Sequence, residues 1–467
     1  MSTPTSAVTV ETRTIDFVPE TERHGSVRSL FTLWFGGNMQ VTAVAAGAIA
    51  VAVGLPLGWA LLASVLGHLL GAVFMALHSA QGPKLGIPQM IQSRAQFGYL
   101  GAVLPLLLVV LMYVGYFASS AVLNGQALAS LTGLPVDVAI VVANAFTAAL
   151  TIFGYRLLHA TEKWLSAISG IAFAVLSIQL LRTYGLGDTG SGEFDVGLFL
   201  LAVAIAATWQ LTYAPYVADY SRYLPEATSV RAAFWYTYTG TVLASSWMFA
   251  FGAVATSAAA GAFDGGSVDF IAGLGGAPVW LFLLVILAGN GAVNALNLYG
   301  MFMSTTTTLT ALGTSRVGPA LRTGLILLGA VVGTVIAVVG RENFLGNFTN
   351  FILLLAYFLI PWTSINLVDF YLVRKERYVI DDIFSATGRY GGVDWRAMTA
   401  YLVGIAIELP FVSSDFYAGP FVEPLGGADV SWIIGIFVAG GLYWALMTKY
   451  PVRRGFDALR GDAPVAS

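Results

Sequence analysis

Long apolar runs alternate with short polar connections along almost the whole chain. Each run is long enough, or nearly long enough, to cross about 30 Å of hydrocarbon as a helix that rises about 1.5 Å per residue. The runs cover residues 31–53, 55–80, 103–130, 135–154, 162–181, 198–218, 232–258, 278–303, 322–340, 345–372, 397–412 and 430–448. The pattern predicts an all-α integral membrane protein with twelve transmembrane helices, numbered here as spans 1 to 12.

The basic residues are distributed unevenly between the connections. All but two of the 22 Lys and Arg residues lie before span 1, after span 12 or in the even-numbered connections, and only Arg182 and Arg341 lie in the odd-numbered ones. Cytoplasmic loops are enriched in Lys and Arg, so we expect a multi-pass protein of the cell (inner) membrane with both termini in the cytoplasm. The pattern also supports twelve spans, because a missed helix would exchange the two sets of loops downstream of it.

Composition narrows the function classes. The chain is 57% hydrophobic and 10% charged, which excludes a soluble domain with an ordinary surface. It has no cysteine, and its basic residues are dispersed rather than patched, so neither a disulfide framework nor a nucleic-acid partner is expected. No motif supports metal, nucleotide or acyl-transfer chemistry, so we expect no cofactor, no metal and no enzyme activity. Residues 1–28 are expected to form a cytoplasmic leader and residues 450–467 a cytoplasmic tail.

Span 1 carries polar residues and glycines where a membrane helix is normally apolar. Gly36 and Gly37 are followed by Asn38 and Gln40. This pattern predicts a helix that opens in mid-membrane and offers backbone groups, and the Asn38 amide, to a ligand. The alternative is close helix packing through small residues.

Span 6 carries a second predicted break. Pro215 lacks a backbone N–H and crowds the preceding turn, so the helix should be kinked or unwound just upstream, with backbone groups open from Thr208 onward. Trp209 and Gln210 lie at this point. An indole face beside an amide suits a flat, polar heteroaromatic ligand. The alternative is a Trp that packs between helices and a Gln bonded to a neighbouring helix.

Spans 3 and 8 each present a polar stripe. On span 3 the stripe has the spacing of one helix face and could equally be packing; its members are Tyr113, Tyr116, Ser120 and Asn124. On span 8, Asn290, Asn294 and Asn297 also share one face. Three unpaired amides facing lipid would be costly, so this face should look onto protein or a wet cavity. It is therefore a candidate binding surface, with interhelical hydrogen bonding as the alternative.

Few ionisable residues lie within the spans. His68 is near the middle of span 2 and Glu408 in the outer half of span 11, whereas Glu162 and Asp219 lie at predicted cytoplasmic ends. His68, Glu162 and Asp219 are candidates for gating or coupling. Hydrogen bonding of the histidine to a neighbouring helix, and ordinary ion pairs for the acids, are the alternatives.

Three separated segments resemble those of purine–cytosine permeases, members of the nucleobase–cation symport-1 family. They are residues 82–98 (GPKLGIPQMIQSRAQFG), 153–164 (FGYRLLHATEKW) and 213–220 (YAPYVADY), and the similarity extends from about residue 20 to residue 450. The resemblance implies a LeuT-like five-plus-five inverted repeat, residues 29–182 and 198–373, followed by two accessory helices in 394–449. It also implies a site in which aromatics of spans 3 and 6 hold a flat heterocycle beside amides. Tyr116, Trp209 and Asn294 match its positions, with Gln210, Asn290 and Asn297 beside them.

Two departures from the family pattern shape the expected function. Ser120 is shorter than the amide usual at its position, and the run Leu283–Gly289 of span 8 lacks the hydroxyls of sodium-coupled members. We therefore expect a monomeric, proton-coupled importer of a nucleobase such as cytosine or a purine, or of a related small heterocycle, working by alternating access. The alternatives are a sodium-coupled importer of hydantoin, allantoin, uracil or a vitamin-like heterocycle, and an amino-acid symporter of the same architecture. A channel or receptor is disfavoured, because the chain lacks rings of charge.

Overall fold

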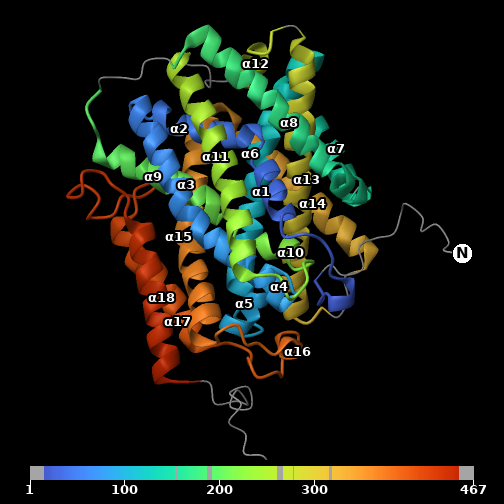
Figure 1. The fold of residues 1–467 in the computed structure, drawn as a ribbon, viewed down its shortest axis with the longest axis vertical. Helices are drawn as coiled ribbons and strands as arrows, with labels where there is room; N and C mark the ends of the chain where they lie inside the picture. Colours follow the sequence, from blue (N-terminus) through green and yellow to red (C-terminus); the bar gives the residue numbers. More distant parts are fainter. Residues whose placement is uncertain are drawn as a thin grey trace, which may run out of the picture.

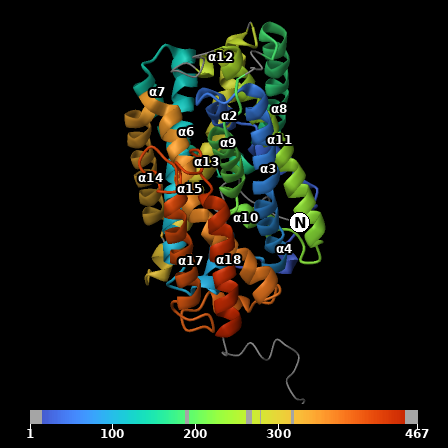
Figure 2. The same ribbon diagram turned by 90° about the vertical axis from the view of Figure 1, so that its left-hand side faces the viewer.

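The protein is a bundle of long helices (Figures 1 and 2). This computed structural model describes residues 15–153, 155–186, 192–259, 267–276, 278–314 and 318–451, and only the backbone of 155–163. The longer helices are α1 (Ser29–Gly37), α2 (Val41–Ala52), α3 (Leu57–Ser79), α6 (Val103–Thr132), α7 (Val136–Phe153), α8 (Tyr155–Tyr184), α9 (Val196–Leu211), α11 (Val230–Ala258), α13 (Val279–Ala311), α14 (Pro319–Gly340), α15 (Phe344–Leu367), α17 (Trp395–Glu408) and α18 (Ser431–Lys449). Short helices lie between them: η1 (Glu20–Glu22), α4 (Gln81–Leu85), α5 (Gln89–Phe97), α10 (Val217–Ser221), α12 (Ser267–Gly273), η2 (Arg341–Asn343), the π-helical η3 (Val368–Val373), α16 (Ile380–Ile383) and η4 (Leu409–Phe411).

Each predicted span corresponds to one helix or to a pair of helices. Within the described residues, eight helical stretches are long and apolar enough to cross a membrane, and the bent pair α1–α2 makes a ninth. One of the eight, Pro319–Val373, contains both α14 and α15, while α9 and α17 are shorter, with 16 and 14 residues. The count of twelve crossings is consistent with this order and stays a prediction.

Span 1 is interrupted after its glycine pair. α1 ends at Gly37, Gln40 is extended with φ −139° and ψ 149°, and α2 begins at Val41 at an angle of 60° to α1. The Met39 N–H donates to the Gly36 carbonyl and the Gln40 N–H to the Asn38 carbonyl, so a short turn replaces the helical hydrogen bonds there.

Span 6 is interrupted later than the sequence suggested. Thr208 lies inside α9, so it does not provide open backbone at a break, and that expectation was wrong. The helix ends at Leu211, four residues before Pro215, because the proline ring would crowd the Leu211 carbonyl. Residues 212–216 form tight turns in which the Ala214 N–H donates to Leu211 O, before α10 begins at Val217.

The helices pack as two groups joined by two bridging helices. One group contains α1, α2, α3, α9 and α11, and the other contains α6, α7, α13 and α14. α8 contacts α1 and α13, and α15 contacts α2, α9 and α6, so each touches both groups. Each predicted repeat contributes to both groups and supplies one bridging helix, which agrees with the expected five-plus-five repeat. α17 and α18 stand together beside α15 (Figure 2).

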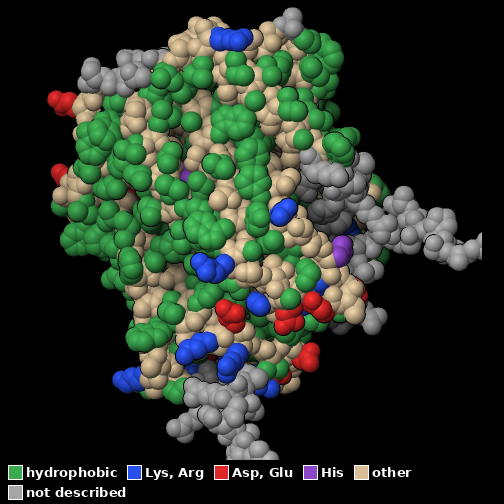
Figure 3. All heavy atoms as spheres, viewed as in Figure 1, with side chains coloured by type: hydrophobic (Ala, Val, Ile, Leu, Met, Phe, Trp, Pro, Cys, Tyr) green, Lys and Arg blue, Asp and Glu red, His purple; other side chains and the backbone are tan. Residues whose placement is uncertain are grey.

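Glycine allows the closest approaches within the first group. A Cβ on Gly252 of α11 would lie 2.0 Å from the Val44 carbonyl oxygen of α2, and one on Gly71 of α3 would lie 2.3 Å from the Ala207 carbonyl oxygen of α9. Such contacts are typical of membrane helices, in which small residues let backbones meet. On the face shown in Figure 3, hydrophobic side chains cover the middle and upper parts, while most charged side chains gather toward the lower end.

Candidate functional site

The two helix breaks meet at Asn38. Its Oδ1 accepts hydrogen bonds from Trp209 Nε1 at 2.8 Å and from the Tyr213 hydroxyl at 3.1 Å. Its Nδ2 donates to the Trp34 carbonyl at 2.7 Å and to Thr241 Oγ1 at 3.1 Å. The amide is fully buried and its bonding capacity is used, so in this conformation it holds the α1 break against α9 and α11.

Tyr116 of α6 lies against Trp209. Their ring centroids are 6.0 Å apart and the ring planes are at 86°, an edge-to-face contact. The Tyr116 hydroxyl donates to Thr212 Oγ1 at 3.0 Å, and Thr212 Oγ1 donates to the Trp209 carbonyl at 2.7 Å. On its other side, Tyr116 meets Phe351 of α15 with centroids 5.1 Å apart. The expected pair of aromatics from spans 3 and 6 is therefore adjacent, and the break after α9 fixes it.

This aromatic pair is closed. Only 8% of Tyr116 and 2% of Trp209 is exposed, and two rings in edge-to-face contact leave no gap between parallel faces. A flat heterocycle can therefore enter between them only after the two rings separate.

Asn290 of α13 joins three helices. Its Nδ2 donates to the Ser120 carbonyl at 3.1 Å and to Asn124 Oδ1 at 2.9 Å, both on α6. Its Oδ1 accepts from Thr42 Oγ1 of α2 at 2.8 Å, and the Thr42 and Ser120 hydroxyls lie 3.4 Å apart. Ser120 and Asn290, predicted separately, thus share one buried polar cluster.

Asn294 differs from Asn290 because its side-chain oxygen is free to accept a hydrogen bond. Its Nδ2 donates to the Phe117 carbonyl at 3.3 Å, whereas its Oδ1 is buried without a hydrogen-bond partner. A buried acceptor left unpaired is costly, so this oxygen is suited to a donor on a ligand. Asn297, one turn further along, is also buried.

Gln210 faces away from the aromatic pair, into the first helix group. Its Nε2 lies 2.5 Å from Ser245 Oγ, to which it donates, and 3.1 Å from His68 Nδ1, while its Oε1 accepts from Thr241 Oγ1 at 2.6 Å. The protein occupies this amide, which favours the interpretation as a contact between helices. His68 is fully buried in the same contact, and its Nε2 has no partner.

The inner-end acids have different surroundings. Asp219 of α10 accepts the Gln89 backbone N–H at 2.7 Å and so ties the end of span 6 to α5. Asp369 forms a buried ion pair with Arg374 at 2.9 Å. Burial lowers the pKa of the Arg374 guanidinium, but the Asp369 carboxylate together with Tyr378, Tyr390 and Tyr443 more than offsets this, so that pKa is raised. The side chain of Glu162 lies outside the described residues.

A small cavity of about 30 Å³ lies beside the α1 break. Gly36 and Gly37 of α1, Ser166 and Ser169 of α8, and Gly289 of α13 line it. A Cβ on Gly289 would lie 2.8 Å from Ser169 Oγ, and one on Gly36 would lie 2.2 Å from Ser166 Oγ. α8 therefore brings hydroxyls to the stretch of α13 where the sequence has none.

Several residues of this region were not among the predicted site residues. Thr42, Thr212, Tyr213 and Thr241 each bond to a predicted site residue or to its neighbour. Thr42, Thr212 and Tyr213 lie in the two polar stretches that marked the breaks, which was the available signal. Thr241 lies in span 7, and nothing in its local sequence distinguishes it.

Comparison with known proteins identifies the family. A family model described as "Permease for cytosine/purines, uracil, thiamine, allantoin" matches residues 17–435. The chain belongs to this family. It is 47% identical over 439 residues to the putative purine-cytosine permease YxlA of Bacillus subtilis, covering 94% of this chain and 96% of that one. The protein is thus a multi-pass membrane permease and not an enzyme, and the resemblance seen in its sequence is confirmed.

Solved structures of Mhp1, a nucleobase–cation-symport-1 family transporter, share the fold. The inward-facing conformation superposes with a TM-score of 0.77 and 20% identity, covering 99% of this chain and 100% of Mhp1. A closed conformation with bromovinylhydantoin bound gives a TM-score of 0.74, covering 97% and 99%. The likeness confirms the predicted all-α, LeuT-like class.

Proposed function

We propose that this permease is a secondary importer of cytosine, a purine or a closely related small heterocycle, working by alternating access. The observation that carries the proposal is the meeting of Tyr116 and Trp209 with the open acceptor of Asn294 near two helix breaks, in a chain of this family. The side chains gathered there are aromatic rings, amides and hydroxyls. An amino-acid symporter would need partners for a carboxylate and an ammonium group, which this set does not provide.

The site residues would have different roles in binding the substrate. Tyr116 and Trp209 would stack on the two faces of the ring once they separate, and Asn294 Oδ1 would accept from an edge N–H. Asn290 and Ser120 would set the position of α6 against α13, with Asn297 at the edge of the site. Asn38 and Gln210 would hold Trp209 and α9 in place through their protein partners.

We further propose that the coupling ion is the proton. The support is the run Leu283–Gly289, which offers no hydroxyl side chain to a hard cation. Glu162, Asp219, His68 and Glu408 are the candidate carriers. Sodium is the second candidate, because Ser166 and Ser169 place hydroxyls at the cavity beside the α1 break. The broken-helix glycines Gly36 and Gly37 would then offer backbone carbonyl groups.

The proposal also covers the membrane location, the orientation and the oligomeric state of the permease. We propose that the permease works as a monomer in the cell (inner) membrane with both termini in the cytoplasm. The proposed orientation is supported by the concentration of Lys and Arg in the even-numbered connections.

The substrate proposal is tested by equilibrium binding to the purified permease. Cytosine, adenine, hypoxanthine, uracil, allantoin, hydantoin and pyridoxine would be compared, with leucine as the amino-acid control. We expect cytosine or a purine to bind at least tenfold more tightly than leucine, since a site that hydrogen-bonds polar edges rejects ligands that lack them. Tightest binding of hydantoin, allantoin or pyridoxine would replace the proposed substrate with that class.

A further inference from the structure

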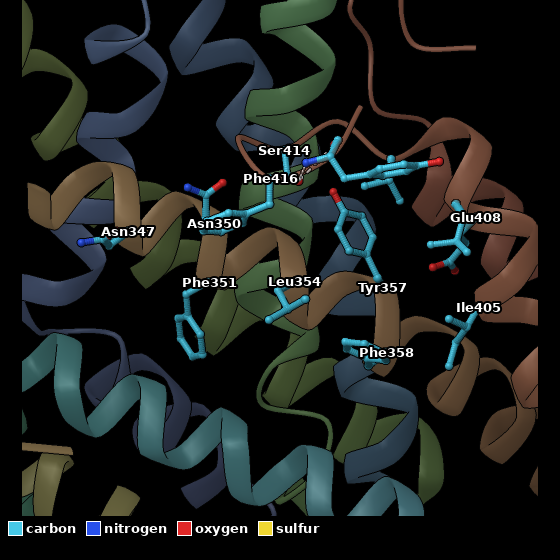
Figure 4. Close-up of a pocket in the computed structure, with 13 residues that line it drawn as sticks. Asn347, Asn350, Phe351, Leu354, Tyr357, Phe358, Ile405, Glu408, Ser414 and Phe416 are labelled. Carbon is cyan, nitrogen blue, oxygen red and sulfur yellow. Dashed lines mark hydrogen bonds between the residues drawn. The ribbon is translucent and has the colours of Figure 1, made fainter. Parts of the chain in front are cut away.

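A second, larger cavity lies between α15, α17 and the segment that follows η4, on the far side of Phe351 from Tyr116. Its volume is about 440 Å³, within the range of small-molecule sites. Leu354, Leu409 and Phe416 line it and are 50%, 49% and 84% exposed, so the cavity reaches the surface. Figure 4 shows Tyr357 and Phe358 from α15 on one side and Ile405 and Glu408 from α17 on the other. The predicted orientation places this end of α17 outside the cell.

The lining is aromatic and contains no basic residue. Phe351, Tyr357, Phe358, Phe416 and Tyr417 contribute rings, and none of the thirteen lining residues is Lys, Arg or His. The negative face of an aromatic ring attracts a cation, most strongly where water is excluded.

One acidic residue lines this cavity, and two more bond to residues of its lining. Glu408 is fully buried in its wall, and neither carboxylate oxygen has a hydrogen-bond partner. Asp429 accepts the Tyr357 hydroxyl at 2.7 Å, and Asp415 accepts Asn350 Nδ2 at 2.7 Å. A lone carboxylate is costly to bury, so it holds a proton unless a positive charge lies beside it. α18 makes room for the Glu408 side chain with Gly435, where a Cβ would lie 1.5 Å from Oε1.

We propose that this cavity is a binding site for an organic ammonium ion with an aromatic or aliphatic body. The rings hold the cation and its apolar body, and the carboxyl groups supply the complementary charge. A neutral heterocycle is a poorer match, because Asn350 and Tyr357 already bond to acidic residues. Phe351 lines the cavity and also packs against Tyr116, so an occupant touches a ring that borders the central site. The proposal does not depend on which heterocycle the permease transports.

The test is calorimetric titration of the full-length permease in phosphatidylglycerol nanodiscs. Phenethylammonium is compared with 2-phenylethanol, which has the same ring and chain length without the charge. We expect the ammonium ion to bind about tenfold or more tightly than the alcohol, and Glu408→Gln to remove that preference. Equal binding of the two ligands, or an unchanged preference in Glu408→Gln, would overturn the proposal.

A second variant guards against misfolding of Glu408→Gln. Leu354→Trp fills the cavity from a half-exposed position, whereas Leu402→Trp, at a 51% exposed position of α17 outside the cavity, is its matched control. Loss of phenethylammonium binding in Leu354→Trp alone supports the site, and equal binding in both variants contradicts it.

Repeating the titration with phosphatidylethanolamine in the nanodiscs separates the two possible sources of the ligand. Competition assigns the site to a lipid ammonium headgroup, and unchanged binding assigns it to a free ammonium ion.

Discussion

At the scale of single residues, Asn38 was predicted to bind substrate, and in this structure its amide bonds to the protein and positions Trp209. Both amide atoms are used by the protein, and the oxygen fixes the Trp209 indole N–H and the Tyr213 hydroxyl. The sequence could place Asn38 at a helix break, but it could not show which partners would use the amide, because Trp209 and Thr241 are far away along the chain.

The aromatic pair should carry much of the binding energy. Trp209→Ala and Tyr116→Ala are each expected to weaken binding of the best heterocycle by roughly tenfold to more than a hundredfold, the value of one stacked ring. Trp247→Ala is the control, because that indole bonds to Ser177 between α11 and α8. Fluorescence or radioligand binding measures the change, and normal affinity in both test variants would remove the proposed slot.

Replacing Asn290 and replacing Asn294 of α13 should have different effects. Asn294→Leu removes an acceptor with no protein partner and should mainly weaken substrate binding, by about tenfold or more. Asn290→Leu removes the acceptor of the Thr42 hydroxyl and the donor to Asn124 Oδ1, and should mainly cost stability, about 1–3 kcal/mol. Binding constants and thermal unfolding of each variant separate the two effects. The same profile in both variants would contradict this division.

At the scale of helices, the breaks could be predicted from the sequence, whereas the packing between helices could not. Pro215 and the Gly36–Gly37 pair mark both interruptions in the sequence, since each acts on its own backbone. The proline acts through the carbonyl four residues earlier, so the α9 break lies after Leu211 rather than at Thr208. The direction of Gln210, into α3 and α11, depends on which face of α9 turns toward those helices. Local sequence does not specify that direction.

The contact between α1 and α8 can be tested by adding a side chain on α1 and removing the one it would meet on α8. Gly36→Ala should clash with the Ser166 side chain and cost about 1–3 kcal/mol, and adding Ser166→Gly should restore most of that loss. Gly37→Ala is the control, because nothing lies within 4 Å of its added Cβ. Thermal unfolding is measured for the unmodified permease, Gly36→Ala, Ser166→Gly, the double variant and Gly37→Ala. Additive losses in the double variant would contradict the packing.

At the scale of the whole molecule, the two helix groups and their bridging helices provide a basis for alternating access. The proposed site lies where Trp209 of α9, in one group, meets Tyr116 of α6, in the other, so relative movement of the groups would separate the two rings. The sequence predicted the helical class and the order of the spans, because apolar runs and basic loops report the membrane directly. It could not predict the closed state of the site, since that depends on how the groups meet.

Orientation is testable because the natural chain has no cysteine. Glu226→Cys lies in an even-numbered connection and Leu134→Cys in an odd-numbered one, and both positions are exposed. A membrane-impermeant maleimide added to intact cells should label position 134 and should label position 226 only after lysis. The unmodified permease is the control, and the opposite pattern would reverse the proposed topology.

The most direct test of the account is accumulation of labelled heterocycle in sealed vesicles containing the purified permease. Vesicles would receive an inward gradient of protons, of sodium or of neither, with cytosine and adenine as first ligands and Trp209→Ala as the control protein. We expect accumulation above the bath concentration with the proton gradient alone, and its loss in Trp209→Ala or with a protonophore. Accumulation driven by sodium alone at symmetric pH would overturn the proton assignment. Failure of any tested heterocycle to accumulate under either gradient would contradict the central claim of a secondary nucleobase importer.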